Sequence, residues 1–404
     1  MPLFSVVIPT FNRAHRLKDA LQSVMAQNHD DYEIVVSDNC SSDNTRDIVE
    51  SFSNQRLRYV RPDSYLRMHD HWEFARKHAQ GDYLLFLADD DCLVENALSA
   101  LATVIREQSP PMVGCRSIDY YSKDYWVKAK RNHIRIEQFS GELLTIDAKV
   151  ALAECFRFHA HPHYYPRVTV PIARSLVEFI ANQAGRFFDY PYPEYVGFAM
   201  VYATIDRYPF LDKPLVVLGR TSDSLGPRYF WSNQDPSWRE MVGKPFSFVP
   251  LKGTYMTNGA AESFLRAKNK IPGRFEGIEL SLVDYYKNYY RDMLTQRWLG
   301  RDIRNDLDEF YGVLECLDPA LRDRVRYSIK DFDLAKPLWY KFLRKIRALR
   351  STLKNAAFRE HNSGDQNVLG EYWINGEKVG VSDITSCAKW ANSQASRYSI
   401  KEIA

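Results

Sequence analysis

The chain of 404 residues lacks several features that would assign it to a class at once. No apolar run approaches the roughly 18 residues that a membrane-spanning helix needs. The first residues contain neither the basic segment nor the long apolar segment of a signal peptide. The net charge is only +3, which argues against a general nucleic-acid binder. We therefore expect a cytoplasmic protein that binds no nucleic acid.

Cysteine and glycine motifs are also missing. The six cysteines form no CxxC pair, which predicts reduced thiols and gives no zinc framework. Neither GxGxxG nor GxxxxGK[ST] occurs, which excludes the common dinucleotide and P-loop phosphate sites. Aromatic residues, in contrast, make up 14% of the chain. Such residues fill cores more often than they line sugar or base sites.

Strand and helix patterns alternate through roughly the first hundred residues. The β-branched or apolar runs at 4–10, 32–38 and 83–88 predict strands that are buried on both faces. Helical spacing of apolar residues lies between these runs. This alternation predicts an α/β fold with a doubly wound, mostly parallel sheet.

Polar residues follow the predicted strands at the points where the strands end. Ligands of doubly wound sheets bind outside the carboxyl ends of the strands, so these residues are expected to form one site. The candidate residues are Pro9, Thr10, Asn12, Arg13, Asp38, Arg61, Asp89, Asp90 and Asp91.

The acidic triplet Asp89–Asp91 has two interpretations. A run of like charges is often simply a solvated loop. Carboxylate oxygens are also the hard ligands that Mg²⁺ or Mn²⁺ prefers, so the triplet predicts a divalent metal that bridges a diphosphate. Asp38 can accept hydrogen bonds from a base or a ribose, and Arg13, Arg61 or Arg67 can supply a second cation. The site predicted from these residues binds a nucleotide diphosphate.

Three blocks of the sequence resemble the opening blocks of family 2 glycosyltransferases, which have the GT-A fold. The blocks are SVVIPTFNRAHRLKDALQSVMAQ, YEIVVSDNCSSDNT and GDYLLFLADDD, and the resemblance is strongest over residues 3–100. It implies a GT-A catalytic domain with a Rossmann-like sheet, followed by a helical C-terminal region. It also implies that Asp38 binds the nucleoside and that the triplet is a DXD-type motif. Asp90 would be the central metal ligand, with Asp91 or Asp89 beside it, and Asn39 replaces an acid that is common in the family.

The resemblance implies an inverting, metal-dependent transfer of a sugar. The donor would be a nucleotide diphosphate sugar, of the UDP or dTDP type before the GDP type, and the acceptor a glycan or lipid-linked glycan. Such a reaction needs a carboxylate base near the acceptor hydroxyl. Glu194 is the first candidate and Asp189 the second, both in the stretch DYPYPEYVGFA. The plain alternative is that Glu194 only stabilises a helix N-terminus.

The predicted regions are a catalytic domain at 1–225, a mostly helical region at 226–335 and a tail at 336–404. Within the first, 1–110 would bind the nucleotide and 111–225 the acceptor. In the tail, Asn375–Gly376 predicts a hairpin.

Three further stretches carry weaker signals. His159, His161 and His163 alternate, and an acceptor-site loop is a better interpretation than a transition-metal site, because no partner has metal-ligand spacing. GRTSDSLG is expected at the rim of the site. Residues 336–359 contain eight Lys or Arg and no Asp or Glu. An amphipathic helix at 337–357 is therefore expected to bind an anionic membrane surface at the inner face of the cell membrane, although packing on the catalytic domain is the alternative.

Two other functions remain open from the sequence. A nucleotidyltransferase can share a similar sheet, although such enzymes usually open with a glycine-rich phosphate loop that PTFNRAHR lacks. A non-catalytic carbohydrate-binding protein can also keep this fold.

Overall fold

The structure is a computed structural model that describes residues 1–159, 161, 163–164, 169–224, 246–298, 300–332, 365–366 and 371–395. The basic helix predicted at 337–357 lies outside these residues. Among the helices that are described, none is both long enough and apolar enough to cross a membrane.

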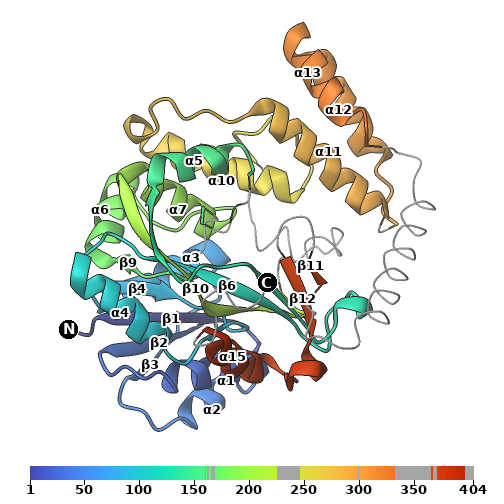
Figure 1. The fold of residues 1–404 in the computed structure, drawn as a ribbon. Helices are drawn as coiled ribbons and strands as arrows, with labels where there is room; N and C mark the ends of the chain where they lie inside the picture. The colour runs from blue at the N-terminus through green and yellow to red at the C-terminus, as the bar shows by residue number, and fades with distance from the viewer. Residues whose placement is uncertain are drawn as a thin grey trace.

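The N-terminal part of the chain forms a five-stranded sheet with the order β3-β2-β1-β4-β9 (Figure 1). Four strands are parallel, and the short β9 runs antiparallel to β4. Every residue of β1 and β2 is buried, as expected of strands covered on both faces. The strands are β1 (Phe4–Thr10), β2 (Tyr32–Asp38), β3 (Leu57–Val60), β4 (Tyr83–Phe86) and β9 (Ile172–Ala173).

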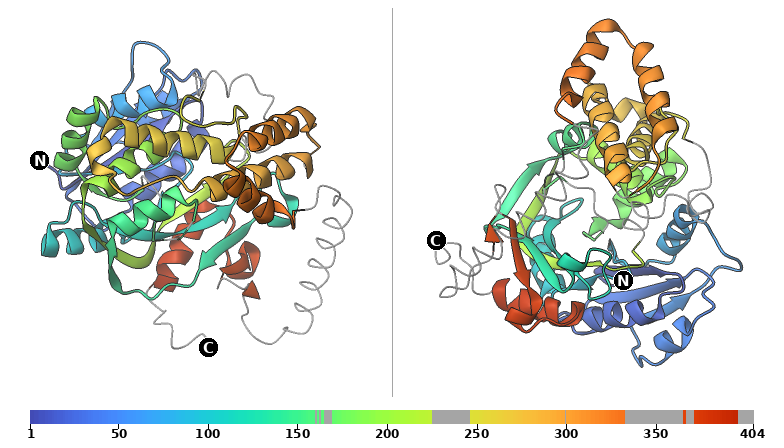
Figure 2. Two further views of the ribbon diagram at one scale, coloured as in Figure 1. Left: turned by 90° about the horizontal axis from the view of Figure 1, so that it is seen from above. Right: turned by 90° about the vertical axis from the view of Figure 1, so that its right-hand side faces the viewer.

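Helices cover both faces of this sheet. Figure 2 shows α3 on the opposite face from α1 and α2, the arrangement that right-handed crossovers between parallel strands produce. The connecting helices are α1 (Ala14–Met25), α2 (Thr45–Glu50), α3 (Met68–Lys77) and α4 (Ala97–Gln108).

A second sheet has the order β11-β12-β7-β6-β10-β5, with β8 paired to β10. The strand β10 is 14 residues long and runs parallel to β6 and antiparallel to β5 and β8. β6 and β7 pair antiparallel. The strands are β5 (Cys92–Leu93), β6 (Gly114–Tyr121), β7 (His133–Glu137), β8 (Leu143–Asp147), β10 (Arg207–Arg220), β11 (Asp365–Gln366) and β12 (Glu371–Asn375).

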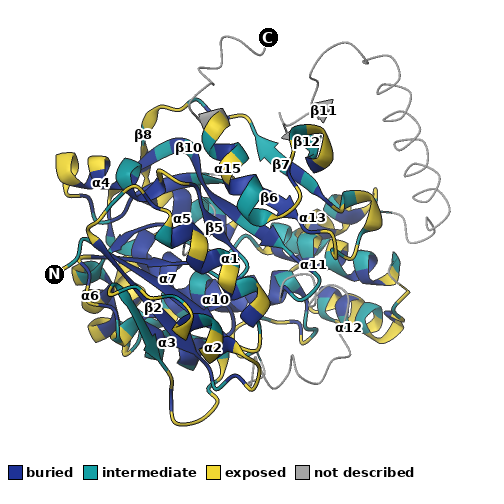
Figure 3. Ribbon diagram, turned by 90° about the horizontal axis from the view of Figure 1, so that it is seen from below, coloured by how far each residue is buried: buried dark blue, intermediate teal, exposed yellow. Residues whose placement is uncertain are grey.

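Helices follow and enclose the two sheets, and α11 to α13 extend away from them (Figure 1). Buried residues concentrate in the strands and in α7, while α12 shows many exposed positions (Figure 3). The helices are α5 (Ala148–Phe156), α6 (Arg174–Ala184), α7 (Pro193–Thr204), α10 (Met256–Lys270), α11 (Leu282–Trp298), α12 (Arg304–Glu315), α13 (Pro319–Ile329) and α15 (Ile384–Ala395). Short 3-10 helices are η1 (Lys128–Lys130), η2 (Pro272–Arg274) and η3 (Gly376–Val379).

The predicted fold class is confirmed: a GT-A-like α/β domain with a mostly parallel first sheet precedes a helical region. The hairpin predicted at Asn375–Gly376 is wrong. The Asn375 side chain accepts a hydrogen bond from the Glu377 backbone N–H at 2.9 Å and starts η3, so the chain does not turn back into a strand. β12 pairs instead with β7 and β11.

Candidate active site

Three strand ends bring Asp38, Thr10 and Asp89 into one row. Thr10 lies level with Asp38 in the pairing of β1 with β2. On its other side, the Thr10 hydroxyl donates to Asp89 Oδ2 at 2.7 Å. Neighbouring strands lie about 4.8 Å apart, so Asp38 and Asp89 are separated by roughly 10 Å across β1. A nucleotide diphosphate can reach over such a distance.

The loops after β1 and β2 hold each other in place. Asn12 and Cys40 both have positive φ angles, 53° and 63°, which are uncommon for residues other than glycine. The Asn12 N–H donates to Ser41 Oγ at 2.8 Å, and Asn12 Oδ1 accepts from the Ser42 N–H at 2.7 Å. Strained backbone of this kind often lies at functional sites, where the surroundings fix it.

Asp38 is fully buried and well supplied with donors. Its Oδ1 accepts from the Ser41 N–H at 2.9 Å, and its Oδ2 accepts from Arg61 Nη1 at 3.0 Å and from the Tyr59 hydroxyl. These donors compensate the desolvation of the carboxylate. Since a carboxylate has about four lone-pair positions, the three described donors leave one position of Asp38 unfilled, although its side chain exposes no surface in this state.

Asn39 and an aromatic pair shape the region beside Asp38. The Asn39 side chain donates to Leu66 O at 2.7 Å and accepts from the Leu66 N–H at 2.9 Å, so it fixes the loop before α3. In that loop, the Tyr65 ring lies 5.1 Å from the Phe11 ring. Both rings are unusually open, with 49% and 42% of their surface exposed. Two exposed aromatic faces beside a buried carboxylate are suited to binding a planar group.

The three acids at the end of β4 differ in their surroundings. Asp90 lies at the tip of the turn in which the Asp91 N–H donates to the Ala88 carbonyl. The Asp91 side chain instead accepts from the Gly219 N–H of β10 at 2.9 Å. Burial raises the pKa of Asp91, with the Asp90 charge adding to the shift. Burial also raises the pKa of Asp89, to about 7, against the opposing effect of Arg13.

Arg13 joins the acids to the segment after β10. Its Nη1 lies 2.5 Å from Asp89, its Nη2 2.7 Å from Asp90, and its Nε 3.3 Å from Asp223. Ser224 Oγ donates to the same Asp90 oxygen at 2.6 Å. The rim position expected for GRTSDSLG therefore coincides with direct contacts to the acids.

The acid cluster fits a divalent cation by the chemistry of its donors. Asp89 and Asp90 already converge on one cationic group, the Arg13 guanidinium, and present hard oxygen ligands. Asp91 has one oxygen engaged by Gly219, which leaves Oδ2 for a ligand. The described residues contain no group of three or more His, Cys, Asp or Glu side chains that could hold a metal ion by itself.

The two candidate bases lie near the start of α7 and differ in their contacts. Glu194 is partly buried in the first turn, and burial raises the pKa of its carboxyl to about 7. Asp189 lies 3.0 Å from Lys270 Nζ and accepts from the Tyr190 N–H at 2.9 Å. Burial would raise the pKa of Asp189, but the hydrogen bond and charge of Lys270 outweigh burial and lower that pKa.

The three alternating histidines contact different groups. His159 Nδ1 lies 2.8 Å from Glu154, whereas His163 Nε2 lies 3.4 Å from Asp212. The His161 ring packs edge-on against His163 at 4.6 Å. These contacts separate His159 from the other two and favour the loop interpretation.

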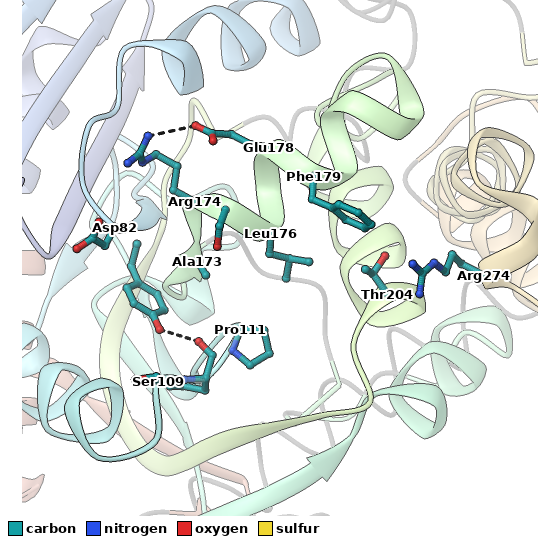
Figure 4. Close-up of a pocket in the computed structure, with 13 residues that line it drawn as sticks. Asp82, Ser109, Pro111, Ala173, Arg174, Leu176, Glu178, Phe179, Thr204 and Arg274 are labelled. Carbon is teal, nitrogen blue, oxygen red and sulfur yellow. Dashed lines mark hydrogen bonds and ion pairs between the residues drawn. The ribbon is translucent and has the colours of Figure 1, made fainter.

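A cavity of about 770 Å³ lies elsewhere, at the amino end of β4 (Figure 4). Tyr83, the first residue of that strand, lines it and donates its hydroxyl to the Pro110 carbonyl at 2.7 Å. Arg174 and Glu178 form an ion pair at its edge. Because Asp89 follows the opposite end of β4, this cavity is separate from the strand-end site.

The sequence interpretation missed several contacting residues. Asp223 and Ser224 were only part of a weak rim signal, and Phe11 and Tyr65 were not singled out. The aromatic at position 11 follows a strand end directly, which could have identified it. Of the other predicted residues, Pro9 is buried in β1, and Arg67 is exposed at the start of α3.

The chain is similar to several known proteins, and the family match lies in its N-terminal part. Residues 5–159 match the family model described as Glycosyl transferase family 2. A Campylobacter jejuni protein named GalNAc(5)-diNAcBac-PP-undecaprenol beta-1,3-glucosyltransferase is 32% identical over 172 residues, which are 39% of this chain and 55% of that protein. Abequosyltransferase RfbV of Salmonella typhimurium is 24% identical over 353 residues, which are 83% of this chain and 97% of that protein.

Solved structures also align along most of the chain. S. aureus TarS 1–349 in complex with UDP-GlcNAc aligns over 90% of this chain and 94% of its own, with 15% identity and a TM-score of 0.45. In its alignments with the Campylobacter protein and with TuaG of Bacillus subtilis, the chain spans only about half of their lengths, 55% and 44%. Residues 5–159 of the chain therefore carry its similarity to glycosyl transferase family 2.

Proposed function

We propose that the protein is an inverting, metal-dependent glycosyltransferase. It moves a sugar from a nucleotide diphosphate sugar to a hydroxyl of a glycan or lipid-linked glycan, in cell-surface polysaccharide assembly. The observation that carries this proposal is the row formed by Asp38, Thr10 and Asp89 at the carboxyl edge of the sheet. In this proposal Asp38 would accept a hydrogen bond from the nucleoside, and Asp89 would lie beside the cation. The separation of roughly 10 Å between Asp38 and Asp89 is one that a nucleotide diphosphate can reach across.

The nucleoside would bind between Asp38 and the aromatic pair. Phe11 and Tyr65 offer open ring faces on which a base can stack, an interaction worth about 1–3 kcal/mol. The remaining lone pair of Asp38 would accept from a base N–H or a ribose hydroxyl. Pro9 and Asn12 shape the loop below, and Arg61 orients Asp38 through its 3.0 Å contact. We propose a UDP- or dTDP-type donor before a GDP-type donor.

The diphosphate would lie against the acid cluster. Asp90 is the first proposed ligand of Mn²⁺ or Mg²⁺, with Asp89 or Asp91 as the second. Such a metal supplies neutralisation of the charge that develops on the leaving diphosphate. The Arg13 side chain supplies a positive charge beside Asp89 and Asp90.

Glu194 would act as the general base. Its deprotonated carboxylate takes the proton of the acceptor hydroxyl as the oxygen bonds to the anomeric carbon. The bond from that carbon to the phosphate oxygen breaks in the same displacement, so the nucleoside diphosphate leaves and the configuration inverts. A pKa of about 7 suits this role, because a base is most effective when its pKa is near the working pH.

The acceptor is proposed from chemistry and from relatives. The name of the Campylobacter relative includes an undecaprenol-linked glycan. In this chain, residues 337–357 carry an unopposed basic stripe that would attract an anionic membrane surface, where lipid-linked acceptors are found. We therefore propose peripheral binding at the inner face of the cell membrane.

The test uses a panel of nucleotide diphosphate sugars with Mn²⁺ and measures the nucleoside diphosphate released. The Asp90→Asn variant should keep the fold and lose most of the turnover that depends on the divalent ion. Undiminished activity of Asp90→Asn, or full activity in excess chelator, would contradict the metal assignment. Release of sugar 1-phosphate instead, by transfer of the nucleotidyl group, would identify a nucleotidyltransferase, and no release with any donor would favour a non-catalytic protein.

A further inference from the structure

Arg13 is the most heavily paired cation of the candidate site. It lies at the start of α1, where all three of its terminal nitrogens face carboxylates of Asp89, Asp90 and Asp223. Only 18% of its side chain is exposed. Burial alone would lower the pKa of Arg13, but its three carboxylate neighbours outweigh burial and raise that pKa. The guanidinium is therefore a permanent positive charge in the cluster.

Arg13 holds one oxygen of Asp89 and one of Asp90, two of the oxygens that a metal bound between these acids would use. Nη1 and Nη2 lie 2.5 and 2.7 Å from Asp89 Oδ1 and Asp90 Oδ2. A Mg²⁺-sized ion needs oxygens at about 2.0–2.1 Å and cannot share the space between them with a guanidinium.

We propose that Arg13 is the resident counter-ion of this cation site, and that a divalent ion binds by displacing its guanidinium from Asp89 and Asp90. This inference rests on the proposed function. It assigns Arg13 two positions: on the acids before a metal binds, and on the donor diphosphate afterwards. In the second position its fork of N–H donors matches phosphate oxygens.

Asp223 provides the anchor for this movement. It pairs with Nε of Arg13 at 3.3 Å and lies outside the pair formed by Asp89 and Asp90. Arg13 can therefore release the two acids and remain tied to Asp223 at the rim. Asp90 keeps its hydrogen bonds from Thr221 at 3.3 Å and Ser224 at 2.6 Å, which hold its carboxylate in place for the incoming ion.

Arg16 is a matched control within the same cluster. Its Nη2 also pairs with Asp223, at 3.3 Å, and with Asp124, and its side chain is 20% exposed. Among the described contacts it reaches neither Asp89 nor Asp90. A change at Arg16 removes an equal charge from the first turn of α1 without freeing the oxygens of Asp89 and Asp90.

The experiment titrates Mn²⁺ alone into the full chain, without nucleotide, and measures binding by calorimetry. Arg13→Gln should bind Mn²⁺ at least about tenfold more tightly than the wild type, because the ion no longer displaces a buried pair. Arg16→Gln should stay within about twofold of the wild type. Arg13→Lys should fall in between, because a single ammonium cannot reproduce the fork that holds both acids.

Equal or weaker Mn²⁺ binding by a folded Arg13→Gln, checked by circular dichroism, would overturn the inference. If Arg13→Gln does not fold, Arg13→Lys decides: affinity no tighter than the wild type also overturns it. Donor turnover separates this from the proposed function. If the wild type transfers sugar but Arg13→Gln gains no affinity for Mn²⁺, only the counter-ion role is contradicted. If Arg13→Gln gains affinity for Mn²⁺ but the wild type uses no donor, only the transferase function is contradicted.

Discussion

Near the start of α7, two carboxyls five residues apart in the sequence lie in opposite electrostatic environments. Asp189 is held by Lys270, which lowers its pKa and pairs with its Oδ2, while its Oδ1 accepts from the Tyr190 N–H. Within the described residues, the Glu194 carboxylate makes no ion pair, and burial raises its pKa to about 7. A carboxylate committed to a salt bridge is a weak proton acceptor, so the structure supports the order of the two candidates.

Replacing Glu194 by Gln should lower turnover by ~10²–10⁴-fold, the usual contribution of a positioned base. Donor affinity should change little, because the base contacts the acceptor. Turnover and donor binding are measured separately, by product release and by calorimetry. Asp189→Asn serves as the comparison, with loss of its Lys270 pair expected to affect stability more than chemistry. A crippled Asp189→Asn beside an active Glu194→Gln would reverse the roles.

The raised pKa of Glu194 also predicts the pH dependence of the reaction. Only the deprotonated carboxylate accepts a proton, so kcat/KM should rise with pH up to about 7 and then level off. Well below that pKa, each unit of pH should change kcat/KM about tenfold. The profile is measured between about pH 5.5 and 8.5. If the acidic limb persists unchanged in Glu194→Gln, another group titrates there.

Residues at strand ends were predictable because their positions follow from the strand pattern alone. Asp38 and Asp89 directly follow or end apolar runs, and parallel strands place such ends together. The contact between Arg13 and Asp223 joins residues 210 positions apart and depends on where β10 ends. No local pattern carries that information, so the sequence supplied the acids but not the network that holds them.

At the scale of elements, β10 passes directly over the acidic turn. Gly219 allows this approach, because a Cβ at that position would lie 1.9 Å from the Asp90 backbone oxygen. The Gly219 N–H also holds Asp91. The spacing between the second sheet and the acidic turn therefore depends on the absence of one side chain.

Gly219→Ala should separate β10 from the turn, with a loss of about 1–3 kcal/mol in the free energy of unfolding. Mn²⁺ binding should weaken as well, because Asp90 and Asp91 would shift. Gly312→Ala in α12 is the control, since nothing lies within 4 Å of its Cβ position. That change should stabilise the helix by about 0.5–1 kcal/mol. Chemical denaturation measures the free energy of unfolding of both variants. An unchanged value for Gly219→Ala would show that the acidic turn can move to admit the methyl group without destabilising the protein.

Element types were largely predictable, but their pairing partners were not. Buried β-branched runs gave β1 and β2, and the apolar spacing gave α1. Asn375–Gly376 carries a strong hairpin signal, yet β12 pairs Asn375 with His133 of β7. A turn signal describes only adjacent residues, whereas the free edge of β7 was invisible in the sequence.

At the scale of the whole molecule, the C-terminal residues complete the core that lies between the second sheet and α1. α15 contacts α1, β5 and β10 (Figure 1). Cys387 and Ala391 of α15 are buried in one cluster with Cys92 and Val217 of the sheet. The division proposed at residue 335 thus assigns to a tail some residues that pack between α1 and the second sheet. Amphipathic spacing predicts that a helix is half buried but does not identify what covers it.

The last prediction concerns the basic stretch 337–357, which lies between the helical region and β12 in the sequence. Residues 337–357 should bring the protein to anionic vesicles, and each Lys or Arg near the surface can contribute ~1 kcal/mol. Replacing Arg344, Lys345, Arg347 and Arg350 by Gln should release it, with activity on a small soluble acceptor preserved. Binding should also weaken as salt rises from about 50 to 500 mM, because salt screens the attraction.

Co-sedimentation with anionic vesicles measures this binding, and α13 supplies a control of equal charge. Replacing Arg322, Arg324, Arg326 and Lys330 by Gln removes four positive charges from α13 and its C-cap. Two of these arginines already pair with Glu315, so they offer little free charge to a membrane. Equal release by both sets would indicate attraction by net charge alone. A wild type that stays in solution at low salt would favour the alternative, in which this helix packs against the protein.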